Sequence, residues 1–346
     1  LLYNDIIEKK EFEAYWNNFE SSCRQTALQS YRLLFLSKYL VQIFAKRGIE
    51  TIVLKGAATA SLYEVPELRK SGDIDLFIPE NVSSKTIIQI MEENGFRTAE
   101  QQHVNHHVVF HTQEGIGIEI HSMLAEPFIF KRINEAMEKH KDECLQHMQM
   151  TEVMGVELPV LDKPFHAYEL ILHMLQHFMY AGFGLKLLCD WVMLWRQEWT
   201  EEEKKLFIQL VKESGIDKFT ESLTAVCTKY LGLQQNSFAW SITIKDTTDL
   251  LLRECLDSEE FGHSDNNRMV MMSGTGLGAF VSEFHHQMHL NFPKAGKCFL
   301  LWPMLWIMTL LRFLRNNKKV RNTSTGAIIK EAKRRSGLMK QLKLFQ

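Results

Sequence analysis

Apolar and polar residues alternate along the chain with two different periods. Between residues 9 and 46 the apolar positions recur at helical spacing, and Gly48 follows where a helix is expected to end. Strand character appears in 50–54, which is apolar and β-branched, and in 73–78. Two further runs within 106–123 are joined by a glutamate-glycine turn, which predicts a hairpin.

Two helices are predicted between these strands. The first begins at Gly56 and ends near Val65, because a residue before a proline avoids the α region. The second runs from a serine cap at 83–84 to Gly95. These elements together predict a small α/β unit that ends near Leu161.

After Pro164 the pattern changes to long helical periods with few strand signals. We therefore expect three parts: N-terminal helices over 1–44, an α/β domain over 45–161 and a helical domain over 162–346.

The predicted helical domain ends in an apolar segment followed by a basic one. Residues 298–311 are fourteen uncharged residues, broken by Pro303, and as a helix they would cover less than the ~30 Å hydrocarbon core of a bilayer. We favour a helix packed against the helical domain over one that lies in a membrane interface. Residues 312–346 hold eleven Lys and Arg against Glu331; such a block is either solvated or meets an anionic membrane or nucleic acid.

Composition places the chain among ordinary globular proteins, with 346 residues, 45% hydrophobic and 24% charged. Its six cysteines include no CxxC pair, which argues against a zinc ribbon or a disulfide framework and favours a reducing, cytoplasmic location. The first residues show no signal-peptide pattern, and a chain that begins with Leu1 leaves its native N-terminus open.

Two aspartates lie two residues apart in the strand predicted over 73–78. Strand geometry places Asp73 and Asp75 on one face, where like charges repel unless a cation lies between them. Mg²⁺ prefers such oxygen ligands, although a strand end that reaches solvent is the alternative. Glu119 has the same alternation in the later strand and His121 shares its face, so three carboxylates could form a two-metal site with His121 near the substrate. Removal of the repulsion between the aspartates should then stabilise the apo protein.

A lysine-glycine turn precedes the aspartates. Gly56 lies at a predicted helix N-terminus, where free N–H groups and the helix dipole favour a phosphate. Lys55 could add a point charge for the β- or γ-phosphate, or it could be a surface lysine at a strand end. A phosphate cradle beside a metal site indicates phosphoryl or nucleotidyl transfer.

The segments LKG, LYEVPELRKSGDIDLFI, EIH and LKLLCDW resemble a bacterial family described as uncharacterised nucleotidyltransferases, within the superfamily that includes DNA polymerase β. This resemblance implies an α+β fold, in which a minimal nucleotidyltransferase domain with a mixed sheet precedes a helical domain. It also implies transfer of a nucleoside monophosphate from an NTP to an acceptor, with two Mg²⁺ ions held by Asp73, Asp75 and Glu119. The acceptor could be a small molecule, a sugar, a protein side chain or an RNA end.

Further residues receive roles from the same resemblance. Nucleotide binding is implied for Lys55, Gly56, Arg69, Gly72 and Lys186, and a substrate-lining position for His121 and Asp190. Lys186 and Asp190 lie four residues apart, so a helix-surface ion pair is an equal alternative.

The chain also departs from the superfamily pattern near the glycine. Ala57 stands where that pattern has a glycine or serine, and fifteen residues separate Ala57 from Asp73. An inactive nucleotide-binding or interaction protein that keeps the fold therefore stays open as the alternative function.

Overall fold

The computed structural model describes residues 9–98, 107–180, 182–235, 247–257, 277–292 and 295–316, together with Phe238, Ile244 and Gly337. His103, His106 and most of the basic C-terminal segment lie outside these residues.

A mixed seven-stranded sheet is the centre of the described chain, in the order β3-β4-β5-β2-β1-β7-β6. Strand β1 pairs antiparallel with β2 and parallel with β7, and β2 pairs parallel with β5. This arrangement confirms the predicted α+β fold with a mixed sheet. The strands are β1 (Ile52–Leu54), β2 (Asp73–Phe77), β3 (Arg97–Thr98), β4 (His107–His111), β5 (Gly117–His121), β6 (Met148–Val153) and β7 (Val156–Leu161).

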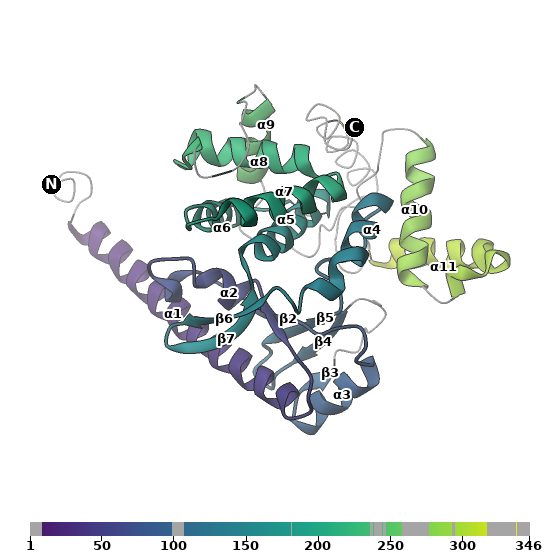
Figure 1. Cartoon of the computed structure of the whole chain (residues 1–346), viewed down its shortest axis with the longest axis horizontal. Coiled ribbons are helices and arrows are strands. Elements are labelled where there is room, and N and C mark those ends of the chain that lie inside the picture. The colour runs from purple at the N-terminus through teal and green to yellow at the C-terminus, as the bar shows by residue number, and fades with distance from the viewer. Residues whose placement is uncertain are drawn as a thin grey trace.

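Helices cover both faces of the sheet and continue into a bundle beside it (Figure 1). The α-helices are α1 (Lys9–Ala45), α2 (Gly56–Ala60), α3 (Ser84–Glu93), α4 (Lys131–His140), α5 (Lys163–Tyr180), α6 (Leu185–Trp195), α7 (Glu201–Ser214), α8 (Asp217–Tyr230), α9 (Thr247–Asp257), α10 (Leu277–Asn291) and α11 (Trp302–Asn316). The short 3-10 helices are η1 (Pro66–Leu68), η2 (Lys141–Glu143), η5 (Ala295–Lys297) and η6 (Phe299–Leu301).

The alternation of side chains along β2 separates two hydrophobic clusters. Ile74 and Leu76 point to the face that α1 and α3 cover, in one cluster of buried residues. Phe77 points to the other face, where Leu54 joins it in a cluster that extends through α5, α6, α7 and α8. The sheet face that carries the odd-numbered positions of β2 therefore lies under the helical part of the chain, and that face carries both aspartates.

Several sequence predictions are confirmed. β4 and β5 form the expected antiparallel hairpin. Ser83 caps the N-terminus of α3, where its hydroxyl accepts a hydrogen bond from the Thr86 N–H at 3.1 Å, and Gly95 follows the end of the helix with a φ of 84°. The long periods after Pro164 correspond to α5, α6, α7 and α8.

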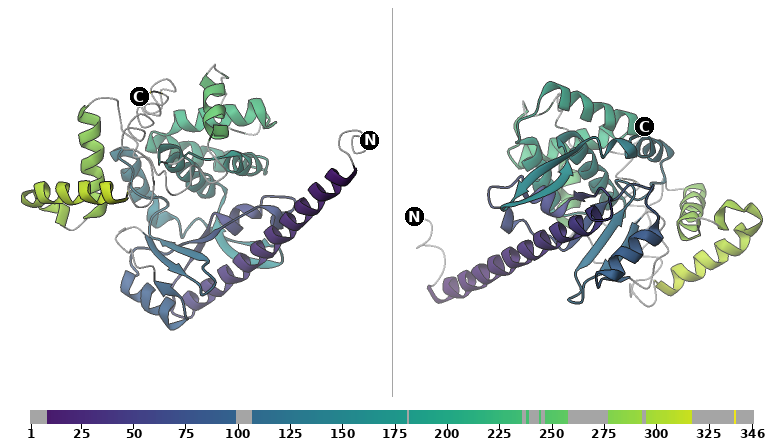
Figure 2. Two further views of the ribbon diagram at one scale, coloured as in Figure 1. Left: turned by 180° about the vertical axis from the view of Figure 1, so that it is seen from behind. Right: turned by 60° about the horizontal axis from the view of Figure 1, so that its bottom comes forward.

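Other predictions need correction. The N-terminal region forms one continuous helix, α1, whose first half extends away from the remaining chain (Figure 2). Helix α2 ends at Ala60 and not near Val65. Beyond it, Leu62 and Tyr63 donate to carbonyls three residues back, and the Tyr63 hydroxyl reaches Asp190 at 2.7 Å. This tertiary contact ends the helix earlier than proline alone would.

The β6–β7 hairpin carries no strong signal in the sequence. Its turn is Met154-Gly155, with φ values of 50° and 76°. Two-residue hairpin turns of this kind normally use asparagine or aspartate before glycine. Because methionine stands in that position, the sequence pattern does not predict the turn.

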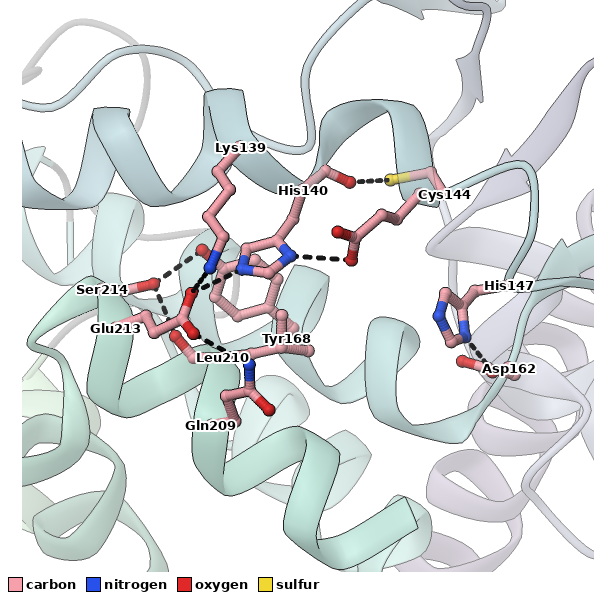
Figure 3. Close-up of polar contacts among 11 residues, drawn as sticks. Lys139, His140, Cys144, His147, Asp162, Tyr168, Gln209, Leu210, Glu213 and Ser214 are labelled. Atoms are coloured by element: carbon pink, nitrogen blue, oxygen red, sulfur yellow. Dashed lines mark hydrogen bonds and ion pairs between the residues drawn. The ribbon is translucent and has the colours of Figure 1, made fainter. Parts of the chain in front are cut away.

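A polar cluster joins α4 to α7 (Figure 3). Glu213 accepts a hydrogen bond from Lys139 Nζ at 2.7 Å and lies 2.8 Å from His140 Nε2. The other ring nitrogen of His140 lies 2.8 Å from Glu143. These contacts hold the pKa of Glu213 down to about 2, because hydrogen bonds from Lys139 and His140 favour its charged form. The cluster thereby fixes the bundle relative to the segment that follows β5.

Candidate functional site

The register between β2 and β5 brings the predicted carboxylates together. Asp75 is the pairing partner of Glu119, and Asp73 is the partner of Gly117. His121 follows two positions beyond Glu119 and projects to the same face. A Cβ atom at Gly117 would lie 3.8 Å from the Cβ of Asp73, so glycine leaves the space beside that aspartate open.

Asp75 is the buried centre of the cluster, with 5% of the residue exposed. Its Oδ1 atom lies 3.0 Å from Lys55 Nζ and 2.9 Å from His121 Nε2. The same histidine nitrogen lies 3.5 Å from Glu119 Oε2. Lys55 follows β1, which pairs with β2 through Leu54 and Asp75, so the sheet itself aims the lysine at the aspartate.

The three carboxyl groups differ in their acidity. Lys55 and His121 hold the pKa of Asp75 well below its usual range, although burial alone would raise it. Asp73 lies at the solvent-exposed start of β2, and partial burial of its carboxyl together with the charge of Asp75 raises its pKa to about 6. Burial and the charge of Asp75 also raise the pKa of Glu119. Lys55 therefore compensates Asp75 more fully than Asp73 and Glu119, whose pKa values stay above their usual range.

The backbone at the lysine-glycine turn adopts an uncommon conformation. Lys55 has a φ of 44° and Gly56 a φ of 34°. Lys55 and Met154 are the non-glycine residues with positive φ among those that the structure describes. Strain of this kind costs on the order of 1–3 kcal/mol and persists where the surrounding structure holds it. In this backbone conformation the side chain of Lys55 reaches Asp75 and forms the ion pair.

Arg69 and Asp190 form a buried bidentate pair. Arg69 Nε donates to Asp190 Oδ1 at 3.0 Å and its Nη2 atom to Oδ2 at 2.8 Å. The remaining Nη1 group donates to the carbonyl of Gly56 at 3.2 Å and to Ser71 Oγ at 2.7 Å. Arg69 thus ties the glycine turn and the loop before β2 to α6.

The other predicted nucleotide-binding residues lie around this centre. Gly72 is exposed immediately before β2. Lys186 Nζ donates to the carbonyl of Lys70 at 3.3 Å, and its charge lowers the pKa of Asp73. Asp190 is fully buried and accepts hydrogen bonds from Arg69 and Tyr63, so it does not form the helix-surface pair with Lys186 that the spacing allowed.

Helix α5 contributes two residues that sequence reasoning did not assign to the site. His173 Nδ1 lies 3.4 Å from Lys55 Nζ. Glu169 is 1% exposed, and its Oε1 atom has no hydrogen-bond partner in the described chain. Burial raises the pKa of Glu169 to about 8 against the opposing charge of Lys55. Glu169 is the one acidic residue in the mostly apolar run 165–180, which is the signal that could have identified it.

The residues present fit a divalent cation. Ligand atoms of Asp75, Glu119 and His121 all lie within 4.8 Å of one another. Carboxylate oxygens are the ligands that Mg²⁺ prefers. A cationic group, the Lys55 ammonium, already lies at Asp75 Oδ1, which shows that the face attracts positive charge. Such a face can hold a metal together with the phosphates of a substrate.

Residues 1–232 match the model of a family described as uncharacterised nucleotidyltransferase. The chain belongs to this family. It is therefore a nucleotidyltransferase by family, and the resemblance read from the LKG and DIDLFI segments is confirmed. No curated protein matches the chain significantly.

Two solved structures resemble the chain distantly. One is an antigenic nucleotidyltransferase-like protein from Paracoccidioides brasiliensis, with 18% identity, a TM-score of 0.33 and coverage of 52% of this chain and 88% of that one. The other is the lincosamide antibiotic adenylyltransferase LnuA with lincomycin bound, with 12% identity, a TM-score of 0.28 and coverage of 50% and 92%.

Proposed function

We propose that this nucleotidyltransferase moves a nucleoside monophosphate from an NTP to an acceptor in a Mg²⁺-dependent reaction. The observation that carries the proposal is the register of β2 and β5, which sets Asp75 beside Glu119 and leaves Asp73 open beside Gly117. Three carboxylates on one sheet face, with a lysine-glycine turn at the end of the neighbouring strand β1, provide groups for both the metal and the phosphates.

Asp73, Asp75 and Glu119 would hold Mg²⁺. When bound, Mg²⁺ neutralises phosphate charge and lowers the pKa of an acceptor hydroxyl. Glu119 would also help to remove the acceptor proton, because its side chain is 35% exposed and therefore accessible to an acceptor. His121 bridges Asp75 and Glu119 and keeps these two carboxylates oriented to the same side.

Lys55 would contact the β- or γ-phosphate of the NTP. Its ammonium lies at Oδ1 of Asp75, one of the carboxylates that would hold the metal. Lys55 would exchange the Asp75 carboxylate for a phosphate oxygen if a metal ion bound to Asp75 together with a triphosphate. Glu169 and His173 on α5 flank its present position.

Arg69 and Asp190 would position this machinery without direct contact with the nucleotide. The guanidinium uses three nitrogens on Asp190, Gly56 and Ser71. Its role is to fix the turn whose backbone N–H groups face the phosphates. This assignment replaces the nucleotide contact that the sequence suggested for Arg69. Lys186, near Asp73, is the better placed cation for the triphosphate.

An inactive nucleotide-binding protein is the second candidate, because the phosphate end of the site departs from the superfamily pattern. Helix α2 has only five residues and begins with glycine and alanine, so it offers a weak dipole and no hydroxyl. Binding without turnover would follow if this end cannot hold the leaving pyrophosphate in line.

A thermal-shift screen tests the proposal. The chain is heated with ATP, GTP, CTP or UTP, each with Mg²⁺ and with EDTA, and the same screen is repeated for Asp73→Asn and Glu119→Gln. We expect at least one NTP to raise the melting temperature only with Mg²⁺, and both variants to lose that rise. Pyrophosphate release with the stabilising NTP then separates an enzyme from an inactive binder. Absence of any Mg²⁺-dependent stabilisation would argue against both.

A further inference from the structure

Helices α10 and α11 contact each other at the edge of the molecule, and the three views agree on their peripheral place (Figure 1, Figure 2). Among the side chains that the structure describes, neither of the two main hydrophobic clusters includes one from these helices. The sequence led us to expect a helix packed into the helical domain. In the structure, α11 packs on α10 in place of such a groove.

The side of α11 that faces α10 is buried by that contact. Leu305 and Thr309 are 2% and 3% exposed. The indole N–H of Trp306 donates to His285 Nδ1 at 3.2 Å, and that of Trp302 donates to the Gly296 carbonyl at 2.7 Å. Both tryptophans therefore face inward.

The outer side of η6 and α11 is apolar and exposed. Leu300 is 74% exposed, Met304 54%, and both Ile307 and Leu311 61%. These four positions follow the spacing of one helix face. We call the whole group the α11 apolar surface: Phe299, Leu300, Leu301, Met304, Ile307, Met308, Leu310 and Leu311.

The stretch of sequence that carries the α11 apolar surface has charges of a single sign. The sequence contains no aspartate or glutamate between Glu283 and Glu331, while it has Lys and Arg at eight positions there. Lys297 is exposed directly before η6, and Arg312 lies at the far end of the apolar stripe, within α11. An aliphatic stripe with cations at both ends complements a surface that is apolar inside and anionic outside.

We propose that the α11 apolar surface docks on an anionic lipid bilayer, with α11 parallel to the membrane plane. Among the helices that the structure describes, none combines the length and apolarity needed to cross a bilayer. A protein partner fits less well, because protein interfaces are anchored mainly by Trp, Tyr and Arg. The exposed side chains here are aliphatic, Met and Phe, whereas both indoles point inward.

Vesicle flotation of the full chain tests this docking. Vesicles of phosphatidylcholine alone are compared with vesicles that also contain phosphatidylserine. We expect binding to the phosphatidylserine vesicles, weakened by salt, and a loss of roughly tenfold or more in the double variant Ile307→Ser/Leu311→Ser. The matched control is Leu28→Ser/Phe35→Ser on α1, whose side chains are 61% and 57% exposed. That control should bind like the unmodified chain.

Three outcomes would overturn the proposal. One is no binding to either kind of vesicle, and another is equal loss in both double variants. The third is self-association, measured by sedimentation equilibrium, that disappears in Ile307→Ser/Leu311→Ser without any vesicle binding; this result would make the surface a protein interface. Because all four substituted residues are exposed, melting temperatures should stay close to that of the unmodified chain and show that each variant is folded.

Discussion

The Lys55 ammonium lies 3.0 Å from Asp75 Oδ1, on the sheet face where the site would hold a divalent cation. The aspartate is buried and the lysine is 18% exposed at its side chain, so this is an ion pair of the interior and not of the surface. The two aspartates of the DxD motif are therefore unequal. Asp75 has internal cationic partners, whereas the pKa of Asp73 is raised to about 6.

Neutralising the two aspartates should have different effects on stability. Asp75→Asn leaves Lys55 partly buried without its nearest anion, so the free energy of unfolding should fall by roughly 3 kcal/mol. Asp73→Asn should change it by no more than about 0.5 kcal/mol, because Asp73 is solvent-exposed and repelled by its neighbours. Chemical denaturation measures both values. This replaces the expectation that removal of the repulsion between the two aspartates stabilises the apo protein, and equal effects of the two variants would contradict it.

Lys55→Met should weaken NTP binding more than NMP binding, because the lysine is assigned to the β/γ end of the nucleotide. Without nucleotide, the same variant should bind Mg²⁺ more tightly, since a competing cation has been removed from Asp75. Calorimetry with NTP, NMP and MgCl₂ gives the three affinities. Lys85→Met serves as the control, because Lys85 is exposed on α3, over the opposite face of the sheet. Equal losses of affinity for NTP and NMP would show that Lys55 does not contact the β- or γ-phosphate.

Stability should depend on pH through Glu169. Its pKa is raised from 4.5 to about 8, so the folded state binds the proton more strongly than the unfolded state. The folded chain therefore loses stability as the pH rises between these values. Glu169→Gln lacks this loss and should gain stability relative to the unmodified chain across the same interval. Denaturation of both proteins at several pH values checks the trend, and two parallel curves would show that Glu169 is not protonated in the folded state.

Asp190→Asn should lower the free energy of unfolding by about 3 kcal/mol or more, because it leaves the buried Arg69 guanidinium without a counter-charge. Glu93→Gln is the matched control, since the Arg47–Glu93 pair has a similar distance, 2.6 Å, but is 54% and 41% exposed. That variant should lose less than about 1 kcal/mol. A positioning role for Arg69 further predicts weaker NTP binding by Asp190→Asn at a temperature where the variant is folded. Unchanged NTP binding would show that the Arg69–Asp190 pair contributes to stability alone.

The sequence was informative where local rules act alone. Strand alternation placed Asp73, Asp75, Glu119 and His121 on common faces, and the structure agrees because the period of a strand admits no other arrangement. Caps and glycines placed α3 correctly.

The remaining features depend on contacts between distant segments, which no local pattern encodes. Arg69 meets Asp190 across 121 positions of sequence, and Lys55 meets His173 across 118. Only the fold brings α5 and α6 over the carboxylate face. For the same reason the sequence could not show that α11 packs on α10. Nor could it show that Tyr63 lies beyond the end of α2, with its hydroxyl donating to Asp190.

Calorimetric titration of the most stabilising NTP, with Mg²⁺ and with EDTA, tests the central claim most directly. It compares the unmodified chain, Glu119→Gln and the control Glu157→Gln, which changes an exposed residue of β7. We predict that affinity falls by at least about tenfold when Mg²⁺ is removed. A similar fall is predicted for Glu119→Gln with Mg²⁺ present, and none for Glu157→Gln. The same affinity with Mg²⁺ and with EDTA, and in all three proteins, would contradict a metal-assisted nucleotidyl-transfer site on β2 and β5.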